Sequence, residues 1–361
     1  MKALVLGTGK SGTAAAAHLK AQGYEVDFAD GYDCVVVSPG LRTKSELQLG
    51  CEELKRRGWK LLAVTGSKGK SSVVKLVADA IGGVPCGNYG RPVTDLVSEK
   101  PGWAVVEVSS FQLETTTLPP DTFEAAAILN LQEDHLDRHG SVEVYHGLKR
   151  KLLTFARKGF VGGESDGLKR KGFRFSTLWA GSYFDNEILA GNAAIAVDLM
   201  RVAGLDDAAI AKAFRGFGPL PHRMNLVAEI GGVRYIDDSK ATSIAALVAG
   251  VKMTGSGVRL IAGGLPKGDD PKVALPTLTE RVKKVYLIGQ SAEAFFAAWK
   301  GAVDCEICGT MDKAVEKAMR EAERGETVLL SPGTASFDQF QSYGERGEVF
   351  ARLVKKEGQP K

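Results

Sequence analysis

The sequence predicts an α/β protein in which mainly parallel sheets are flanked by helices. Short apolar runs alternate with amphipathic stretches along the whole chain of 361 residues, and this alternation is typical of parallel strands connected by helices. Glycine-rich turns at residues 7–12 and 66–69 each follow an apolar run and lead into a helical pattern. Acidic and hydroxyl residues gather directly after other apolar runs, where open α/β sheets place their chemistry.

The individual elements follow from the two kinds of periodicity. Apolar runs bounded by turn residues, too short for helices, predict strands at residues 3–6, 25–29, 34–37, 61–64, 104–108, 126–129, 258–262, 284–288 and 327–330. Longer stretches with apolar residues at helical spacing predict helices at residues 71–80, 192–203, 206–214, 312–323 and 344–356. The first run passes directly into glycines, so it predicts a buried strand rather than a signal peptide.

Two seams interrupt this pattern. One is the basic stretch 56–60, just before a new strand, and the other is the Gly/Pro cluster Phe-Gly-Pro-Leu-Pro at 217–221. We therefore expect three α/β domains, at residues 1–60, 61–218 and 219–361.

Composition excludes several classes of protein. Lys+Arg number 47 and Asp+Glu 43, a net charge of +4 without the concentrated basic face of a nucleic-acid binder. No apolar run approaches the roughly 18 residues of a membrane span. Five cysteines with a single C-x-x-C, Cys305 and Cys308, indicate neither a disulfide framework nor a zinc site. We expect a cytoplasmic protein with reduced thiols and no nucleic-acid or membrane partner.

The turn at 65–72, Thr-Gly-Ser-Lys-Gly-Lys-Ser-Ser, predicts a phosphate-binding loop. A strand, a glycine turn and a helix N-terminus direct backbone N–H groups and the helix dipole at an anion. Lys70 can reach the β- and γ-phosphates of a nucleotide, and Ser71 can bind Mg²⁺. The motif is a shorter G-x-x-G-K-S form, because Val64 stands where the longer motif has its first glycine.

The earlier turn, Gly-Thr-Gly-Lys-Ser-Gly at 7–12, matches G-x-G-x-x-G, and Asp30 follows the second strand. This is a dinucleotide fingerprint, although a glycine turn without a ligand explains the same residues.

Glu107 lies at the C-terminal end of the predicted strand 104–108, and His135 comes after the predicted strand 126–129. A carboxylate and an imidazole at neighbouring strand ends can share a Mg²⁺ that bridges nucleotide and substrate.

In the last third of the chain, Lys240, Lys267 and Ser336 each follow a predicted strand end. Converging cations and a hydroxyl there suit a small dicarboxylate or the phosphates of a nucleotide.

Taken together, these segments resemble the Mur ligase family, and within it the branch that adds D-glutamate. The resemblance extends over essentially the whole chain in family order. It is carried by residues 65–72, Gly-Asn-Tyr-Gly-Arg-Pro (87–92), Glu-Val-Ser-Ser-Phe-Gln-Leu-Glu (107–114), Leu-Asn-Leu-Gln-Glu-Asp-His-Leu-Asp-Arg-His (129–139), Leu-Pro-His-Arg (220–223), Asp-Ser-Lys-Ala-Thr (238–242) and Leu-Ser-Pro-Gly-Thr-Ala-Ser-Phe-Asp-Gln-Phe (330–340).

The resemblance implies three domains: a shortened Rossmann-like UDP-binding domain, a P-loop ATPase domain and a Rossmann-like amino-acid-binding domain. It implies an ADP-forming ligase, expected to be a monomer, that uses ATP and two Mg²⁺ ions. Its substrates would be UDP-N-acetylmuramoyl-L-alanine and D-glutamate, joined through an acyl phosphate and a tetrahedral intermediate in peptidoglycan precursor synthesis.

The resemblance also implies roles for particular residues. Lys70, Glu107, His135 and Lys149 would be catalytic, with Ser71, Glu107, His135 and an N6-carboxylated Lys149 as metal ligands. ATP would contact Gly66, Ser67, Lys68, Gly69, Lys70, Ser71, Ser72, Asn192, Arg223 and Asp238. Lys10, Ser11, Asp30 and Ser38 would face the UDP group, Asn88 and Ser109 the muramoyl-alanine end, and Lys240, Thr242, Lys267, Ser336, Phe337 and Tyr343 the D-glutamate.

Alternative functions stay open at this point. The chain could be another ligase of the superfamily, adding a different amino acid or acting on folate, or a catalytically silent nucleotide-binding scaffold of the cell-wall pathway. An NAD dehydrogenase is suggested only by the first glycine turn, and the sequence offers no residue set for hydride transfer.

Overall fold

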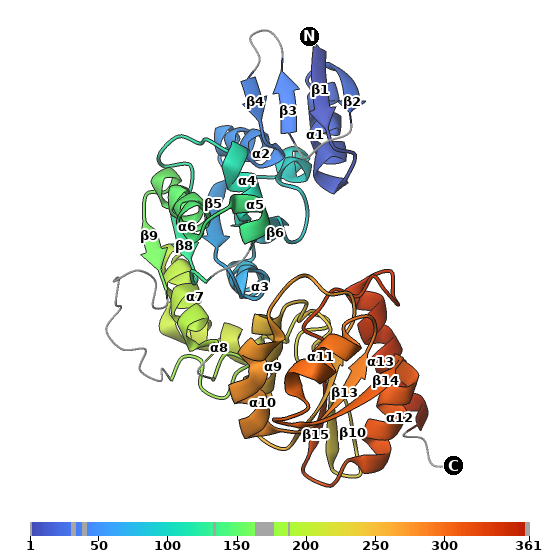
Figure 1. The fold of residues 1–361 in the computed structure, drawn as a ribbon. Helices are drawn as coiled ribbons and strands as arrows, with labels where there is room; N and C mark the ends of the chain where they lie inside the picture. The colour runs from blue at the N-terminus through green and yellow to red at the C-terminus, as the bar shows by residue number, and fades with distance from the viewer. Residues whose placement is uncertain are drawn as a thin grey trace. The chain divides into compact units, whose positions relative to one another are not determined.

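The computed structural model describes residues 2–29, 34–37, 42–132, 135–162, 177–186 and 188–357. The chain divides into two compact units, Met1–Phe217 and Gly218–Lys361. Four-stranded and five-stranded sheets lie in the first unit and a six-stranded sheet in the second, so the predicted α/β class is confirmed (Figure 1). No helix in these ranges combines the length and apolar character that a bilayer crossing requires.

The first sheet differs from the mainly parallel arrangement that we expected. Its order is β2 (Glu25–Ala29), β1 (Lys2–Leu6), β3 (Cys34–Val37), β4 (Arg42–Lys44). Only β1 and β2 are parallel, whereas β3 is antiparallel to both β1 and β4. Only residues 30–33 separate β2 from β3, and a connection between parallel strands needs about a dozen residues. The sheet is therefore mixed.

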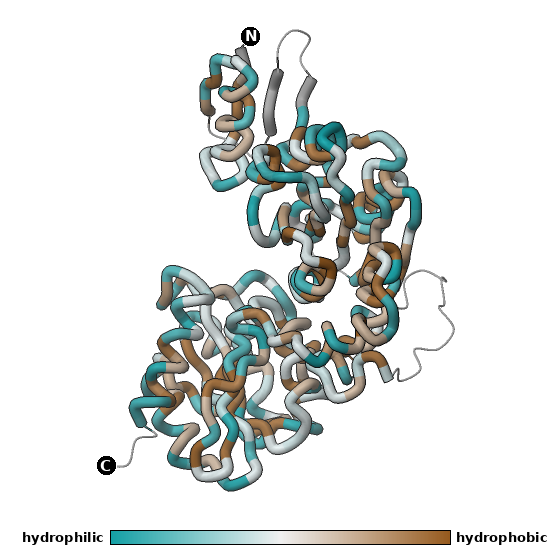
Figure 2. Tube along the Cα trace, turned by 180° about the vertical axis from the view of Figure 1, so that it is seen from behind, coloured by the Kyte–Doolittle hydropathy of each residue, from teal (hydrophilic) through white to brown (hydrophobic). Residues whose placement is uncertain are grey.

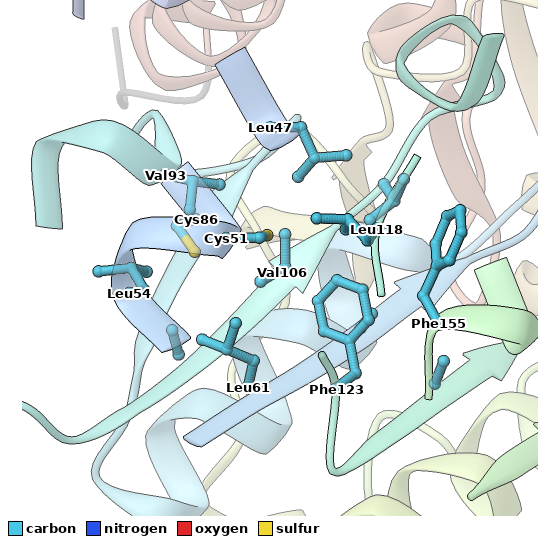
Figure 3. Packing of buried hydrophobic residues seen from close by; sticks show 14 of the residues in the cluster. Leu47, Cys51, Leu54, Leu61, Cys86, Val93, Val106, Leu118, Phe123 and Phe155 are labelled. Atoms are coloured by element: carbon cyan, nitrogen blue, oxygen red, sulfur yellow. The ribbon is translucent and has the colours of Figure 1, made fainter. Parts of the chain in front are cut away.

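Helix α2 (Glu46–Arg56) joins the first sheet to the second. Its Leu49 packs against the small core formed between the first sheet and α1 (Lys10–Ala21). Its Leu47, Cys51 and Leu54 lie in the larger core of the second sheet, beside Val106 (Figure 3). The first sheet thus has a small core of its own, and α2 links it to the core of the second sheet within the same unit.

The second sheet is entirely parallel, in the order β6 (Val84–Gly87), β7 (Trp103–Glu107), β5 (Lys60–Thr65), β8 (Ala125–Ile128), β9 (Gly159–Val161). Its three inner strands, β7, β5 and β8, are buried on both faces, as expected for a parallel sheet. One face packs on α2 and on the 3₁₀ segments η1 (Val93–Ser98) and η2 (Leu152–Phe155). Helix α3 (Lys70–Ile81) packs on β7 and on α7 (Ala190–Val202). Further helices are α4 (Ser110–Thr115), α5 (Leu136–His139), α6 (Val142–Lys151) and α8 (Asp207–Gly216).

The sheet of the second unit has the order β10 (Asn225–Ile230), β11 (Val233–Asp237), β15 (Thr327–Leu330), β12 (Val258–Gly263), β13 (Val282–Ile288), β14 (Asp304–Gly309), and only the β10–β11 pair is antiparallel. The helices α9 (Ile244–Thr254), α10 (Leu275–Arg281) and α11 (Ala292–Trp299) share one core cluster with these strands, with η3 (Pro271–Ala274) beside them. The helices α12 (Met311–Glu321) and α13 (Tyr343–Glu357) share another. The inner strands are the brown segments of this unit in Figure 2.

The C-x-x-C of the sequence falls on β14. Cys305 packs against the cluster that contains α9, α10 and α11, and Cys308 belongs to the cluster that contains α12 and α13. The two thiols therefore lie on opposite faces of the strand and do not form a redox or metal pair with each other.

A buried carboxylate lies where α2 meets η1. Glu46 is 3% exposed, and its Oε1 accepts hydrogen bonds from the backbone N (2.8 Å) and the hydroxyl (3.0 Å) of Thr94. Its Oε2 has no partner. Burial raises the pKa of Glu46 from 4.5 to about 6, since a low-dielectric environment disfavours the charged form.

This shift predicts a pH dependence of stability. The folded state holds its proton more tightly than the unfolded state, so stability should fall as the pH rises from about 4.5 through about 6, by about 2 kcal/mol. Glu46→Gln should remove this fall and raise the free energy of unfolding at pH 7 relative to wild type. Urea unfolding at pH 4.5 and pH 7 measures both quantities. An unchanged pH dependence in the variant would contradict the prediction.

Candidate active site

The loop between β5 and α3 has the geometry that its sequence predicts. Gly66 has φ +151° and Gly69 has φ +84°, conformations that residues with a Cβ rarely adopt. Gly69 directly precedes α3 as its N-cap. A Cβ on Gly69 would lie 2.1 Å from the side-chain nitrogen of Asn192 on α7. The glycine thus permits the loop to approach the residue that we expected at the adenine site.

Two lysines converge on one backbone oxygen of this loop. Lys70 Nζ donates to the carbonyl oxygens of Gly66 (2.7 Å) and Ser67 (3.2 Å). Lys149 Nζ, on α6, also donates to Gly66 O (3.2 Å) and lies 4.5 Å from the ring centroid of Tyr145. Lys149 is only 1% exposed. Two lysine side chains from different helices thus lie at the carbonyl oxygens of this loop, and a cationic side chain there suits an anionic ligand such as phosphate.

The segment that follows β8 holds the loop in place. Asn130 Oδ1 accepts from the backbone N of Lys68 (2.8 Å), and its Nδ2 donates to Lys68 O (3.0 Å). The Ser67 hydroxyl donates to Gln132 O (3.0 Å) and accepts from Tyr145 (3.2 Å). The Ser67 side chain therefore supports the loop itself, which sequence reasoning did not anticipate. Ser71 and Ser72 lie in the first turn of α3, the former half-buried and the latter buried.

Glu107 ends β7, paired in register with Val64 of β5. Its side chain is 2% exposed; Oε1 accepts from Asn88 Nδ2 (2.7 Å), and Oε2 has no hydrogen-bond partner. An unsatisfied buried carboxylate oxygen is costly, so this atom fits a cation ligand. Among the described residues, there is no group of three or more His, Cys, Asp or Glu side chains that could hold a metal ion. A cation at Glu107 would need other oxygen ligands such as hydroxyls or phosphates, which Mg²⁺ accepts.

His135 has a left-handed backbone conformation, φ +54°, directly before α5. Its exposed ring lies edge-on to Phe111, with 5.0 Å between the ring centroids. A neighbouring network joins α4 to α5. His139 contacts the Ser110 hydroxyl (3.0 Å) and Glu114 Oε1 (3.1 Å), and Arg138 donates to Glu114 Oε2 (2.7 Å). The sequence analysis missed this network, although the i, i+4 spacing of the two histidines is visible in it.

The expected UDP and muramoyl residues are only partly accounted for. Lys10 and Ser11 lie in the first turn of α1, whose N-terminus has no side-chain cap. Ser109 caps α4, with Gln112 in a capping box, and Asn88 orients Glu107. Asp30 and Ser38 lie outside the described residues.

In the second unit, Asp238 follows β11 and is buried, with Oδ2 accepting from the Ser331 hydroxyl (2.9 Å). Burial raises its pKa to about 7, and the nearby Arg223 guanidinium partly opposes this increase. The preceding Asp237 accepts from His222 Nδ1 if that nitrogen is protonated (2.7 Å). A Cβ at Gly347 would lie 2.2 Å from the same nitrogen, so α13 can approach this pair only through a glycine.

The loops after β11, β12 and β15 carry the expected amino-acid residues. Lys240 Nζ lies 3.8 Å from the ring centroid of Tyr343, and a bridge between Leu265 and Ala335 brings two of the loops side by side. Ser336 is buried and Thr242 half-buried, whereas Lys267 is exposed and Phe337 is 69% exposed. The structure joins Lys240 to Tyr343 directly and places Ser336 next to the bridge.

Sequence reasoning also missed Arg346. This residue is fully buried, and its guanidinium donates to Ser239 Oγ and O, Thr334 O and Ala335 O, at 2.9 to 3.2 Å. The sequence predicted the surrounding helix but gave no sign that this one arginine on it would be buried.

The parallel sheets and the phosphate loop define an α/β nucleotide-binding protein. Comparison with known families shows to which family of such proteins the chain belongs. The Mur ligase middle-domain model matches residues 64–162, and the model of the Mur ligase glutamate ligase domain matches residues 222–333. The chain is 34% identical to UDP-N-acetylmuramoylalanine–D-glutamate ligase of Acidobacterium capsulatum, over 98% of this chain and 96% of that protein. The chain belongs to the Mur ligase family.

Solved structures share the fold. A MurF ligase from Thermotoga maritima in complex with ADP has a TM-score of 0.63 at 16% identity, covering 86% of this chain and 84% of that one. The bifunctional folylpolyglutamate synthase/dihydrofolate synthase of Yersinia pestis, complexed with AMPPNP and a manganese ion, has a TM-score of 0.59 at 16% identity, covering 96% and 100%.

The two glycines that flank α3 allow a matched test of the loop. Gly69→Ala and Gly82→Ala both place an alanine at positive φ, +84° and +62°, but only the first meets a neighbour, Asn192. We expect each variant to lose about 1 kcal/mol of stability, and Gly69→Ala alone to weaken Mg²⁺–ADP binding about tenfold or more. Isothermal titration calorimetry measures the affinity. Equal affinities in the two variants would refute a role for the Gly69–Asn192 approach.

Proposed function

We propose that this protein is an ADP-forming ligase that adds D-glutamate to UDP-N-acetylmuramoyl-L-alanine in peptidoglycan precursor synthesis. The phosphate loop with Lys70 at the start of α3, together with the buried, unpartnered Oε2 of Glu107 at the end of the neighbouring strand, carries the proposal, because these groups suit a phosphate and a cation. The name of the Acidobacterium relative supports the choice of D-glutamate, as do residues 238–242 and 330–340. We further propose that the enzyme acts as a cytoplasmic monomer.

The reaction needs an activated carboxylate, since a carboxylate is itself a poor electrophile. A carboxylate oxygen of the alanyl group attacks the γ-phosphorus of ATP, and the bond to ADP breaks to leave an acyl phosphate. The amine of D-glutamate then adds to the acyl carbon. The resulting tetrahedral intermediate expels inorganic phosphate, and the amide nitrogen loses a proton.

The positive charges near Gly66 suit the first step. Lys70 would follow the γ-phosphate as negative charge develops on its oxygens, and the backbone N–H groups at the start of α3 would bind the β-phosphate. Asn192 would contact adenine, and Arg223 and Asp238 the phosphates and ribose.

Ser71, Glu107, His135 and Lys149 would hold two Mg²⁺ ions, which when bound offset the negative charge of the two anionic reactants. The unpartnered Oε2 of Glu107 fits this role. An ammonium at Lys149 would repel a cation, whereas an N6-carboxylated lysine supplies an anionic oxygen, so we propose that modification.

In the second unit, Lys240, Thr242, Lys267, Ser336, Phe337 and Tyr343 would form the D-glutamate pocket. At the other end of the substrate, Lys10, Ser11, Asp30 and Ser38 would bind the UDP group, and Asn88 and Ser109 would lie near the muramoyl-alanine.

Substrate omission tests the proposed reaction. Phosphate release should require UDP-N-acetylmuramoyl-L-alanine, ATP, Mg²⁺ and D-glutamate together, and leaving out any one should abolish it. Replacing D-glutamate by L-alanine, L-lysine or diaminopimelate should give no release. Turnover with one of these and none with D-glutamate would instead indicate another ligase of the superfamily, and no turnover with any would indicate a silent nucleotide-binding protein.

The modification of Lys149 has its own test. Lys149→Ala should greatly reduce kcat, and short carboxylates such as formate or acetate should partly restore it by supplying the missing oxygen ligand. Lys151→Ala is a matched control on the same helix, because Lys151 Nζ donates to Leu113 O (3.1 Å) and takes no part in the proposed metal site. Loss of activity without rescue would argue against carboxylation.

A further inference from the structure

Arg346 occupies an unusual environment for a charged side chain. It is fully buried on α13, yet the four acceptors of its guanidinium are neutral: the hydroxyl and carbonyl oxygens of Ser239 and the carbonyl oxygens of Thr334 and Ala335. Burial lowers its pKa to about 10, although the nearby Asp338 and Asp237 carboxylates partly oppose this decrease, and the group stays charged at neutral pH. A buried cation is costly, so a stabilising hydrophobic side chain would be the simpler occupant if packing were its only role.

The acceptors belong to two different loops. Ser239 lies after β11, between Asp238 and Lys240, and Thr334 and Ala335 lie after β15, directly before Ser336. The planar guanidinium has five N–H donors in a fixed fork, so one side chain sets the separation and orientation of both loops. The two loops also contact each other directly, since Gly333 N donates to Ala241 O (2.9 Å).

Ser239 extends the link to a third segment. Its hydroxyl accepts from Arg346 Nε (2.9 Å) and donates to Tyr343 O (2.8 Å). Tyr343 begins α13, and its ring lies against Lys240. The space for the guanidinium is made by Gly264, where a Cβ would lie 3.1 Å from Arg346 Nη1 and 2.4 Å from Ala335 O. The buried Arg346 guanidinium thus connects the three segments that carry Lys240, Ser336 and Tyr343, in part through Ser239.

We propose that Arg346 is a positioning residue for the amino-acid pocket: it acts through the loops 238–242 and 331–337, and fixes the relative placement of the side chains that would bind the D-glutamate carboxylates. The inference rests on the proposed function for the identity of the amino acid. Positioning at this accuracy matters because a displacement of about 1 Å can cost about a hundredfold in rate.

The test compares Arg346→Lys with Arg259→Lys, a matched control. Arg259, on β12 of the same sheet, is also largely buried but pairs with Glu326 (2.5 Å) and Tyr286 (2.9 Å), and it takes no part in the proposed pocket. Lysine keeps the charge but lacks the fork. Arg346→Lys should raise the KM for D-glutamate about tenfold or more and leave the KM for UDP-N-acetylmuramoyl-L-alanine within about twofold, whereas Arg259→Lys should change neither.

Hydrogen exchange gives a readout that does not depend on activity. Amides in 238–242 and 331–337 should exchange faster in Arg346→Lys and not in Arg259→Lys. Ser239→Ala, a milder change, should show the same pattern more weakly, and it decides the question if Arg346→Lys does not fold. Equal increases in both KM values, or loop exchange no faster than in the control, would overturn the inference. Absence of D-glutamate-dependent turnover in wild type would overturn the proposed function instead, while the exchange result would still test the positioning role.

Discussion

Two lysine side chains, Lys70 and Lys149, donate to the carbonyl oxygen of Gly66, and the strands and helices around the phosphate loop place them there. Lys70 begins the helix that follows the phosphate loop, and Lys149 lies on a helix after β8, so the parallel sheet brings the two together. Cationic side chains at the carbonyl oxygens of a phosphate-binding loop suit an anionic ligand. The position next to Gly66 therefore suits phosphate oxygens, or a modified Lys149. At the end of the adjacent strand, the buried Oε2 of Glu107 has no hydrogen-bond partner and suits a cation.

The second unit uses buried charge in a related way. The Arg346 guanidinium is surrounded by backbone carbonyls and one hydroxyl, and Asp238 is held by Ser331 with its pKa raised by burial. Both groups cost free energy to bury, and both anchor loops at the carboxyl edge of a parallel sheet. Such an edge is where open α/β sheets bind ligands. Burying these two groups lowers the stability of the fold, and in return their hydrogen bonds hold the loops in a defined geometry.

Strands with a continuous apolar run were predicted well, and several edge strands without one were missed. The bounds of β3 and β15 match the predicted runs, because each is a short apolar segment between turns. The strands β6, β9 and β14 lie at sheet edges and are only partly buried, so their composition lacks a continuous apolar run. The mixed first sheet was not foreseen, since apolar runs carry no information on strand direction.

Among the site residues, local motifs identified those whose chemistry depends on adjacent positions. Gly66, Gly69, Lys70 and Ser71 were predicted from strand, turn and helix signals in one segment, and the sequence Gly-Lys-Ser between a strand and a helix has few other uses. By contrast, two features join residues far apart in the chain: the carbonyl oxygen shared by Lys70 and Lys149, and the four acceptors of Arg346. The unpartnered oxygen of Glu107 likewise results from tertiary packing. These features depend on the order of the strands in each sheet and on which polar side chains become buried when the sheets assemble. The sequence by itself thus determined the elements, the phosphate loop and the family resemblance, whereas only the tertiary structure decided where buried charges meet, because burial and long-range pairing arise only when the sheets have assembled.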